Sequence, residues 1–228
     1  MTRITTCIFD AYGTLFDVSA AARALAGEPG REGFAAVWQQ VAADWRAKQL
    51  EYSWLRAVTG DYCDFWQLTE HGLDWALERA GLADAGLREA LLSLYWQLEA
   101  YPEVPGMLAR LKAGGLACGI LSNGSPAMLE GAVASAGIGA HLDAVVSVER
   151  VGTFKPDARV YDLVGAQFGC ARDAVLFVSS NGWDIAGAAA YGFRTLWVNR
   201  AGLPVDRLPG KPQDIAADLT AVPSMLGV

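Results

Sequence analysis

The chain has 228 residues, of which 53% are hydrophobic and 19% are charged, and its formal net charge at pH 7 is −7. This composition is typical of a globular protein and excludes an intrinsically disordered one. The absence of a basic cluster argues against a nucleic-acid-binding protein. No apolar stretch approaches the roughly 20 residues that a membrane span needs, and no signal peptide is recognisable, so we expect a cytoplasmic protein.

The cysteines and histidines are widely separated and form no metal-binding pattern. Two of the four cysteines lie in apolar, strand-like runs, and no CxxC pair occurs. We therefore expect buried free thiols in a reducing cytosol, and no zinc site. The residues concerned are Cys7, Cys63, Cys118, Cys170, His71 and His141.

In chain order, the first predicted element is an apolar run over residues 4–9, and four similar runs follow in the second half of the chain. They are nearly continuous, which is typical of strands covered on both faces. Helical patterns lie between them, which predicts a doubly wound parallel sheet, a Rossmann-like, three-layer α/β fold. The later strands are expected at 116–121, 144–147, 174–178 and 195–198, and the helices at about 126–136, 157–168 and 184–191.

Residues 18–98 interrupt this alternation with helical patterns alone. We predict that they form a helical cap domain inserted into a core domain made of residues 1–17 and 99–228. Six of the eight tryptophans lie in this insertion, and they are explained either by packing within a helical bundle or by a dimer face or pocket wall. One apolar stripe at helical spacing consists of Phe34, Val37, Val41 and Trp45.

Polar residues stand where the predicted strands end. The first strand runs into Asp10 and the second into Ser122-Asn123-Gly124. Lys155 follows the third strand, and the fourth runs into SSNGWD, residues 179–184. The carboxyl ends of parallel strands share one edge of the sheet, where such folds bind ligands. Turn and capping propensities explain each residue alone, but four such loops together predict a functional site.

Other catalytic motifs are missing from the sequence. No G-x-S-x-G follows a strand, and the last histidine, His141, comes too early for a hydrolase of that type. Neither the dinucleotide-binding glycine pattern nor a P-loop occurs. The candidate that remains is a carboxylate nucleophile, Asp10.

Four motifs resemble those of one superfamily. FDAYGTLFD at residues 9–17, LSNGSP at 121–126, Lys155-Pro156 and FVSSNGWD at 177–184 are similar, in order and spacing, to the motifs of the haloacid dehalogenase superfamily. The segment DWRAKQLEYSWLR, residues 44–56, makes the chain most similar to the L-2-haloacid dehalogenases of type II. The resemblance runs nearly from end to end.

The residue two positions after Asp10 separates dehalogenases from phosphatases. Phosphatases of this superfamily commonly have an acid there, which protonates a strongly basic alkoxide leaving group, and they hold Mg²⁺ with further carboxylates. In this chain the position is Tyr12, and carboxylates are scarce in the loop that contains Asp184. A halide is a weak base and leaves without a proton. We therefore expect a metal-independent dehalogenase, with a Mg²⁺-dependent small-molecule phosphatase and a non-catalytic anion-binding relative as the alternatives.

The resemblance implies a reaction in two steps. Asp10 displaces halide from the α-carbon of a short L-2-haloacid, and water hydrolyses the resulting aspartyl ester to a D-2-hydroxyacid, with inversion. The residues expected in catalysis are Asp10, Thr14, Arg46, Lys155, Ser179, Asn181 and Asp184. Those expected around the substrate are Tyr12, Leu50, Phe65, Ser122, Asn123, Tyr161 and Trp183.

Individual roles follow from the same resemblance. Arg46 is expected to receive the halide, and Ser122 to hold the substrate carboxylate near a helix N-terminus. Lys155 should balance the charge of Asp10, and Asp184 should orient or activate the hydrolytic water. The expected partners are the haloacid substrate and the halide product, without a metal, cofactor, nucleic acid or membrane, and the expected assembly is a homodimer.

Overall fold

The computed structural model describes residues 2–82 and 84–228, and within them six parallel strands form one sheet in the order β3-β2-β1-β4-β5-β6. This order reverses direction at β1, which is typical of doubly wound folds. The strands are β1 (Thr6–Phe9), β2 (Ala117–Ser122), β3 (Ala144–Ser147), β4 (Val175–Ser179), β5 (Arg194–Val198) and β6 (Asp214–Ala216).

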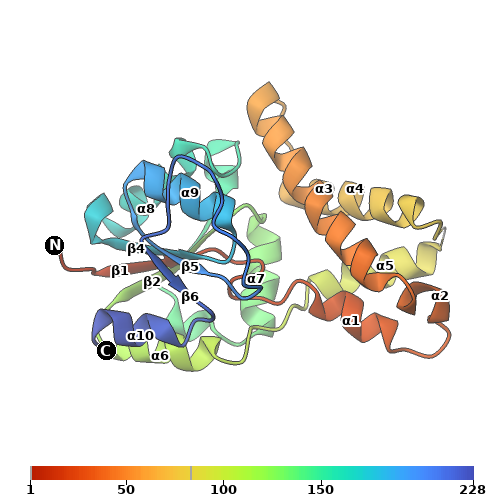
Figure 1. Ribbon diagram of the computed structural model, residues 1–228, viewed down its shortest axis with the longest axis horizontal. Helices are drawn as coiled ribbons and strands as arrows, with labels where there is room; N and C mark the ends of the chain where they lie inside the picture. The colour runs from red at the N-terminus through yellow and green to blue at the C-terminus, as the bar shows by residue number, and fades with distance from the viewer. Residues whose placement is uncertain (1, 83) are drawn as a thin grey trace.

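Helices cover both faces of the sheet, with α8 and α9 on one face and α6 and α10 on the other (Figure 1). The predicted three-layer α/β fold is therefore confirmed. The helices of this part are α6 (Val104–Ala113), α7 (Pro126–Ser135), α8 (Ala158–Phe168), α9 (Gly182–Tyr191) and α10 (Ala221–Leu226), with short 3-10 turns η1 (Gly139–His141), η2 (Val148–Val151) and η3 (Arg172–Ala174).

Burial explains which strands the sequence pattern revealed. Every residue of β1 and β4, at the centre of the sheet, is buried, as expected from continuous apolar runs. The edge strand β6 was not predicted. It has three residues, and its one large apolar side chain, Ile215, is 53% exposed, so it carries no apolar run.

The helix starts that the sequence indicated are made by side-chain caps. Ser125 accepts a hydrogen bond from the Met128 N–H at the start of α7, and Asp157 accepts one from the Arg159 N–H at the start of α8. At the other end of α8, Gly169 takes the left-handed conformation with φ 62°, as expected for a glycine that ends a helix.

Between β1 and α6, the described residues form a group of helices, which Figure 1 shows beyond the carboxyl ends of the strands. The predicted single stripe from Phe34 to Trp45 is divided, because the chain leaves helical geometry at Val37, between α2 and α3. The helices are α1 (Ala20–Ala26), α2 (Glu32–Ala35), α3 (Trp38–Thr59), α4 (Phe65–Arg79) and α5 (Ala85–Tyr95).

The long helix α3 packs closely against α4. The Trp45 indole N–H donates to the Thr69 carbonyl at 2.7 Å, and the Gln49 amide donates to the Thr69 hydroxyl at 2.9 Å. Gly72 allows this approach, since a Cβ atom there would lie 3.2 Å from the Trp45 carbonyl oxygen. Packing within the bundle explains Trp45, which is buried, whereas Trp54 is 36% exposed.

Two linkers join the helical segment to the sheet, and they run side by side. Phe16 in the outgoing linker forms an antiparallel bridge with Ala100 in the returning one. The Asp17 N–H donates to the Glu99 carbonyl at 3.0 Å, and the Tyr101 N–H donates to the Leu15 carbonyl at 2.9 Å. The connection is thus a short two-stranded hinge.

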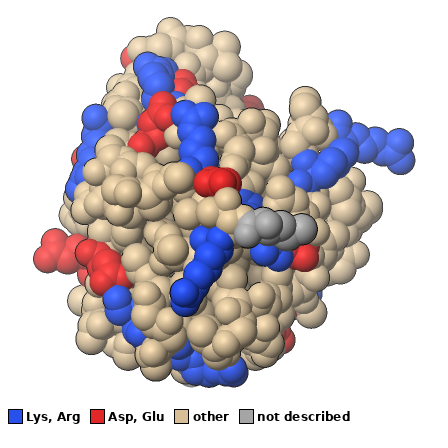
Figure 2. Space-filling view, turned by 90° about the vertical axis from the view of Figure 1, so that its left-hand side faces the viewer, with Lys and Arg blue, Asp and Glu red and all other residues tan. Residues whose placement is uncertain are grey.

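The surface carries both signs of charge. Figure 2 shows basic side chains lying among acidic and uncharged ones on the face that it presents. None of the helices in residues 2–82 and 84–228 combines the length and the apolar character needed to cross a bilayer.

Candidate active site

Strand register places Asp10 at the centre of the carboxyl edge of the sheet. The residue before it, Phe9, is opposite Ile120 of β2 on one side and Val178 of β4 on the other. The Asp10 N–H continues the ladder by donating to the Val178 carbonyl at 2.9 Å. The loops after β1, β2 and β4 therefore leave the sheet next to one another, and Asp10, 6% exposed, lies between them.

Three donors hold the Asp10 carboxylate. Oδ2 accepts hydrogen bonds from the Thr14 hydroxyl at 3.1 Å and the Asn181 amide at 2.9 Å, whereas Oδ1 accepts one from Lys155 Nζ at 3.0 Å. Thr14 is itself fixed, because its hydroxyl oxygen accepts the Ser180 N–H at 2.8 Å. Donors of this kind fix the orientation of the carboxylate.

Lys155 lies between two buried carboxylates. Its Nζ is 3.0 Å from Asp10 Oδ1 and 2.8 Å from Asp184 Oδ2, and both Lys155 and Asp184 are completely buried. Burial by itself lowers the pKa of Lys155, but the charges of Asp10 and Asp184 outweigh it and hold this pKa above its ordinary value. Burial raises the pKa of Asp184, the Lys155 charge opposes that rise, and the Asp10 charge adds to it, so the pKa stays raised.

Tyr161 lies behind Asp184 rather than beside the predicted substrate position. Its hydroxyl donates to Asp184 Oδ1 at 2.8 Å, and its side chain is completely buried. Burial raises the pKa of Tyr161 well above its ordinary value, and the Asp184 charge raises it further, so the phenol keeps its proton for this bond. The expected substrate-binding residue is therefore a residue that orients Asp184.

The loop after β2 is tied to the Lys155 backbone. The Asn123 amide oxygen accepts the Lys155 N–H at 3.0 Å, and the Ser122 hydroxyl accepts the Gly124 N–H at 3.1 Å. The Ser147 hydroxyl at the end of β3 donates to the Gly124 carbonyl at 2.7 Å. These bonds place Ser122 and Asn123 at the rim of the site and fix the shape of their loop.

The loop after β4 is shaped in the same way. The Ser179 hydroxyl accepts the Asn181 N–H at 3.1 Å, which turns the chain into α9 and places Asp184 in the first turn of that helix. Ser179 thus positions Asn181 and is not among the direct donors to Asp10. Ser180, which the sequence analysis did not single out, has its hydroxyl 3.1 Å from that of Thr14.

Aromatic rings form a wall over the first loop. The Tyr12 ring stacks on Tyr95 with centroids 5.6 Å apart and on Phe65 with centroids 6.4 Å apart. The Tyr12 hydroxyl is buried without a hydrogen-bond partner in the part of the chain that the structure describes. Burial raises the pKa of Tyr12 well above its ordinary value, as does neighbouring Tyr95, while Arg46 opposes the rise. Tyr95 was missed, because a tyrosine in an amphipathic helix gives no motif signal.

The helix α3 carries Arg46 to the edge of the site. Its Nη2 atom is 3.5 Å from both the Tyr12 carbonyl and the Asn181 amide oxygen, a long distance for hydrogen bonds. Among the residues that the structure describes, most of the five donors of the guanidinium have no hydrogen-bond partner. The predicted pocket residue Leu50 lies one turn further along α3 and is half-buried.

Trp183 marks a second contact between the helical segment and the sheet. It is half-buried at the start of α9, and its ring meets the Trp54 ring of α3 edge-on, with centroids 5.4 Å apart. The contact joins α9 to α3, and the role of Trp183 as a pocket residue stays a prediction.

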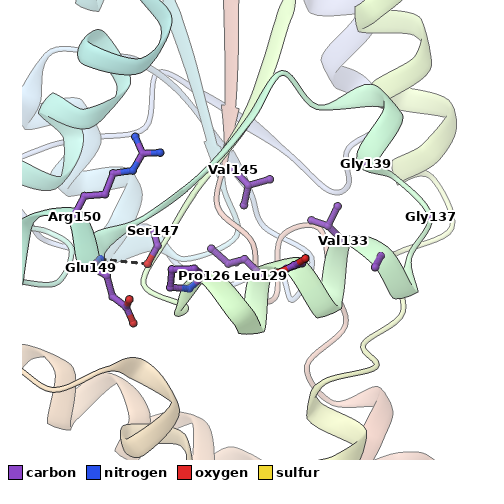
Figure 3. A pocket seen from close by; sticks show the side chains of 11 residues that line it. Pro126, Leu129, Val133, Gly137, Gly139, Val145, Ser147, Glu149 and Arg150 are labelled. Carbon is purple, nitrogen blue, oxygen red and sulfur yellow. Dashed lines mark hydrogen bonds between the residues drawn. The ribbon is translucent and has the colours of Figure 1, made fainter.

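A separate groove of about 630 Å³ lies between α7 and β3 (Figure 3). Its labelled side chains, such as Leu129, Val133 and Val145, are largely apolar. The residues that line it include none of the predicted site residues. One lining residue, Ser147, connects the groove to the site, because its hydroxyl donates to the Gly124 carbonyl in the loop after β2.

The donor set around Asp10 contains one candidate cation, the ammonium of Lys155. Within residues 2–82 and 84–228, no three His, Cys, Asp or Glu side chains cluster in a way that could hold a metal ion. Lys155 Nζ bridges Asp10 and Asp184 and supplies the positive charge between them.

Comparison with protein families decides the assignment, because the model of the haloacid dehalogenase-like hydrolases matches residues 4–192 of the chain. The chain belongs to this family. The match spans the helical segment as well as most of the sheet, and it includes every predicted site residue.

Individual members of the family are similar over nearly the whole chain. The (S)-2-haloacid dehalogenase 1 of Pseudomonas sp. (strain CBS-3) is 43% identical over 99% of this chain and 98% of its own. The (S)-2-haloacid dehalogenase of Pseudomonas sp. (strain YL) is also 43% identical, over 94% of this chain and 90% of its own. A crystal structure of the Xanthobacter autotrophicus L-2-haloacid dehalogenase with chloropropionic acid covalently bound superimposes with a TM-score of 0.86, at 35% identity and 98% coverage of both chains.

Proposed function

We propose that the protein hydrolyses short L-2-haloacids to D-2-hydroxyacids, with inversion and without a metal ion, through an ester formed on Asp10. The observation that carries this proposal is the aromatic wall of Tyr12, Tyr95 and Phe65 at the position where a phosphatase needs a leaving-group acid. Burial raises the pKa of Tyr12, so its phenol is an even weaker acid than usual. A halide leaving group needs no proton donor.

In the first step, Asp10 attacks the α-carbon of the substrate. Oδ1 accepts one hydrogen bond and Oδ2 accepts two, so Oδ1 has more lone-pair density free and is the attacking atom. The new C–O bond forms as the carbon–halogen bond breaks, and in-line geometry inverts the α-carbon. Arg46, whose donors are largely free, receives the departing halide.

In the second step, water attacks the carbonyl carbon of the Asp10 ester. Negative charge then develops on Oδ2, where the Thr14 hydroxyl and the Asn181 amide already donate. Asp184, next to Lys155, accepts the proton of the attacking water. Collapse of the intermediate breaks the bond between the aspartyl carbon and the substrate oxygen, and that oxygen takes the proton held by Asp184, which releases the hydroxyacid. The Asp10 carboxyl then loses its proton to solvent and is again a carboxylate.

The raised pKa of Asp184 predicts how the second step depends on pH. Asp184 must be ionised to accept a proton, and burial together with Asp10 raises its pKa despite Lys155. The rate of ester hydrolysis should therefore fall on acidification at a higher pH than an exposed aspartic acid would give. Single-turnover decay of the ester, followed over a range of pH, measures this limb. A decay rate that does not change with pH would contradict the role of Asp184 as the proton acceptor in ester hydrolysis.

Halide release tests the proposed activity directly. The purified protein, in the presence of a chelator, is expected to release chloride from L-2-chloropropionate and not from its D-enantiomer. Hydrolysis of para-nitrophenyl phosphate that depends on added Mg²⁺, without halide release from any short L-2-haloacid, would instead support the phosphatase alternative.

We also propose that the protein is a cytoplasmic homodimer. Its four cysteines are unpaired thiols, which stay reduced in a cytosol. The C-terminal end of α3 extends beyond the other elements (Figure 1) and exposes Leu55 by 55% and Val58 by 86%. Such a projecting apolar surface fits a second copy.

Solution mass tests the dimer. Val58→Glu is expected to shift the protein from the mass of two chains toward that of one in size-exclusion chromatography with light scattering. Val205→Glu, on an exposed loop after β5, is the matched control and should leave the mass unchanged. A wild-type protein that remains a monomer at every concentration would refute the dimer.

A further inference from the structure

Arg200 lies just after β5, outside the set of residues already assigned to the site. Its Nη2 atom donates to the Thr14 carbonyl at 3.2 Å and is 2.7 Å from Glu103 Oε1. Its guanidinium carbon lies 3.7 Å from the centroid of the Tyr101 ring. One side chain thus contacts the loop after β1 and the segment that returns from the helices.

These contacts surround the two-stranded hinge. Thr14 and Leu15 begin the outgoing linker, and Tyr101 and Glu103 end the returning one. The hinge has few backbone hydrogen bonds of its own, so further contacts decide how firmly it is held. Arg200, anchored on the sheet, clamps both linkers against the core.

The ion pair of this clamp is well placed to contribute. The Arg200 and Glu103 side chains are 22% and 16% exposed, so solvent screens their attraction less than it screens a surface pair. A guanidinium over an aromatic ring gains further attraction, and its flat shape matches the Tyr101 face. A second ion pair near β5, Arg194 with Asp214, lies at the start of that strand and is 36% and 35% exposed.

The hinge helps to set the position of Arg46, together with the contacts of Tyr12 with Phe65 and Tyr95 and of Trp54 with Trp183. Arg46 belongs to α3, and its hydrogen bonds to the sheet domain within residues 2–82 and 84–228 are the long 3.5 Å contacts with Tyr12 and Asn181. Such contacts do not fix a guanidinium by themselves. A small rotation of the helices about the linkers would move Arg46 away from the point where the halide leaves.

We propose that Arg200 is a positioning residue for dehalogenation, acting through the hinge to hold Arg46 over Asp10. This inference rests on the proposed function for its kinetic part. Its structural part, the clamp on the linkers, can be measured without any substrate.

Hydrogen exchange tests the clamp itself. In Arg200→Met, the amides of Asp17 and Tyr101, which bond across the linkers, are expected to exchange faster than in the wild type. Arg194→Met, the matched control at the start of β5, should leave both unchanged. Equal exchange in the two variants would overturn the clamp. Tyr101→Leu, which removes the stacked ring and keeps the ion pair, serves the same comparison if Arg200→Met does not fold.

Leaving-group dependence tests the effect on Arg46. Misplacement of a group by about 1 Å can cost up to about 100-fold in rate, and we expect Arg200→Met to lose about 10- to 100-fold in the kcat for L-2-chloropropionate. The loss should be smaller for the bromo analogue, since bromide leaves with less assistance, and Arg200→Lys should recover part of it. Equal losses for both halides, or losses matched by Arg194→Met, would overturn the inference. If the wild-type protein released no halide but Arg200→Met still exchanged faster than the wild type, the proposed function would be refuted and the clamp would stand.

Discussion

Asp10→Asn is expected to abolish dehalogenation, lowering the rate of halide release by about 10⁴-fold or more, as removal of a covalent nucleophile does elsewhere. An amide has nearly the same shape but lacks the nucleophilic carboxylate, and its NH2 group cannot accept the hydrogen bonds given to one of the two oxygens. Lys155 keeps Asp184 as its partner, so the fold should persist. The measurement is halide release from L-2-chloropropionate under single-turnover conditions, alongside the thermal unfolding of the variant.

Asp162→Asn provides the control for this substitution. Asp162 is an exposed aspartate that pairs with Arg172 at 3.2 Å, away from the strand ends. Its replacement should leave halide release within a factor of about two, because surface ion pairs contribute little to stability or geometry. Substantial halide release by Asp10→Asn, with the fold intact, would contradict the assignment of Asp10 as the nucleophile.

Lys155→Met is expected to lower both activity and stability. It leaves Asp10 and Asp184 facing each other in the interior without a cation, and breaking a buried ion pair in this way costs about 3–5 kcal/mol in the free energy of unfolding. Burial and the Asp10 charge then raise the pKa of Asp184 without the opposing charge of Lys155, so the folded state binds more protons than the unfolded one. The lost stability should therefore return as the pH falls.

Urea denaturation at about pH 7.5 and about pH 5.5 measures this effect as the difference in the free energy of unfolding between Lys155→Met and the wild type, which should be smaller at the lower pH. Lys112→Met is the matched control, since Lys112 pairs with Asp143 at the surface, and its loss should cost no more than about 1 kcal/mol at either pH. If Lys155→Met were as stable as Lys112→Met at neutral pH, the charges of Asp10 and Asp184 would not depend on Lys155.

The sheet could be predicted because its strands are buried on both faces. Such strands are continuous apolar runs, and the boundaries differ from those predicted by one or two residues, as with β4 at Val175–Ser179. The strand β6 escaped because an exposed edge strand needs no such run. The break in the helix at Val37 was not predicted, because the apolar spacing continues through it. Tertiary packing decides where α3 begins.

The residues of the candidate site also fall into those that the sequence could place and those that it could not. Residues that follow strands, such as Asp10 and Lys155, could be placed together because parallel strands share an edge. Tyr161 and Ser179 were included by resemblance, but their contacts come from side-chain directions that spacing does not contain. Tyr95 belongs to neither class, since a core aromatic and a pocket wall look alike in a sequence.

The central claim is that Asp10 attacks carbon and then carries the ester. One measurement tests it most directly: a single turnover of L-2-chloropropionate in ¹⁸O-labelled water, with mass spectrometry of the hydroxyacid and of the peptide that contains Asp10. The account predicts an unlabelled hydroxyl in the product and label in the Asp10 carboxylate, because water attacks the ester at the aspartyl carbon. Label in the product of that first turnover, with Asp10 unlabelled, would contradict the account.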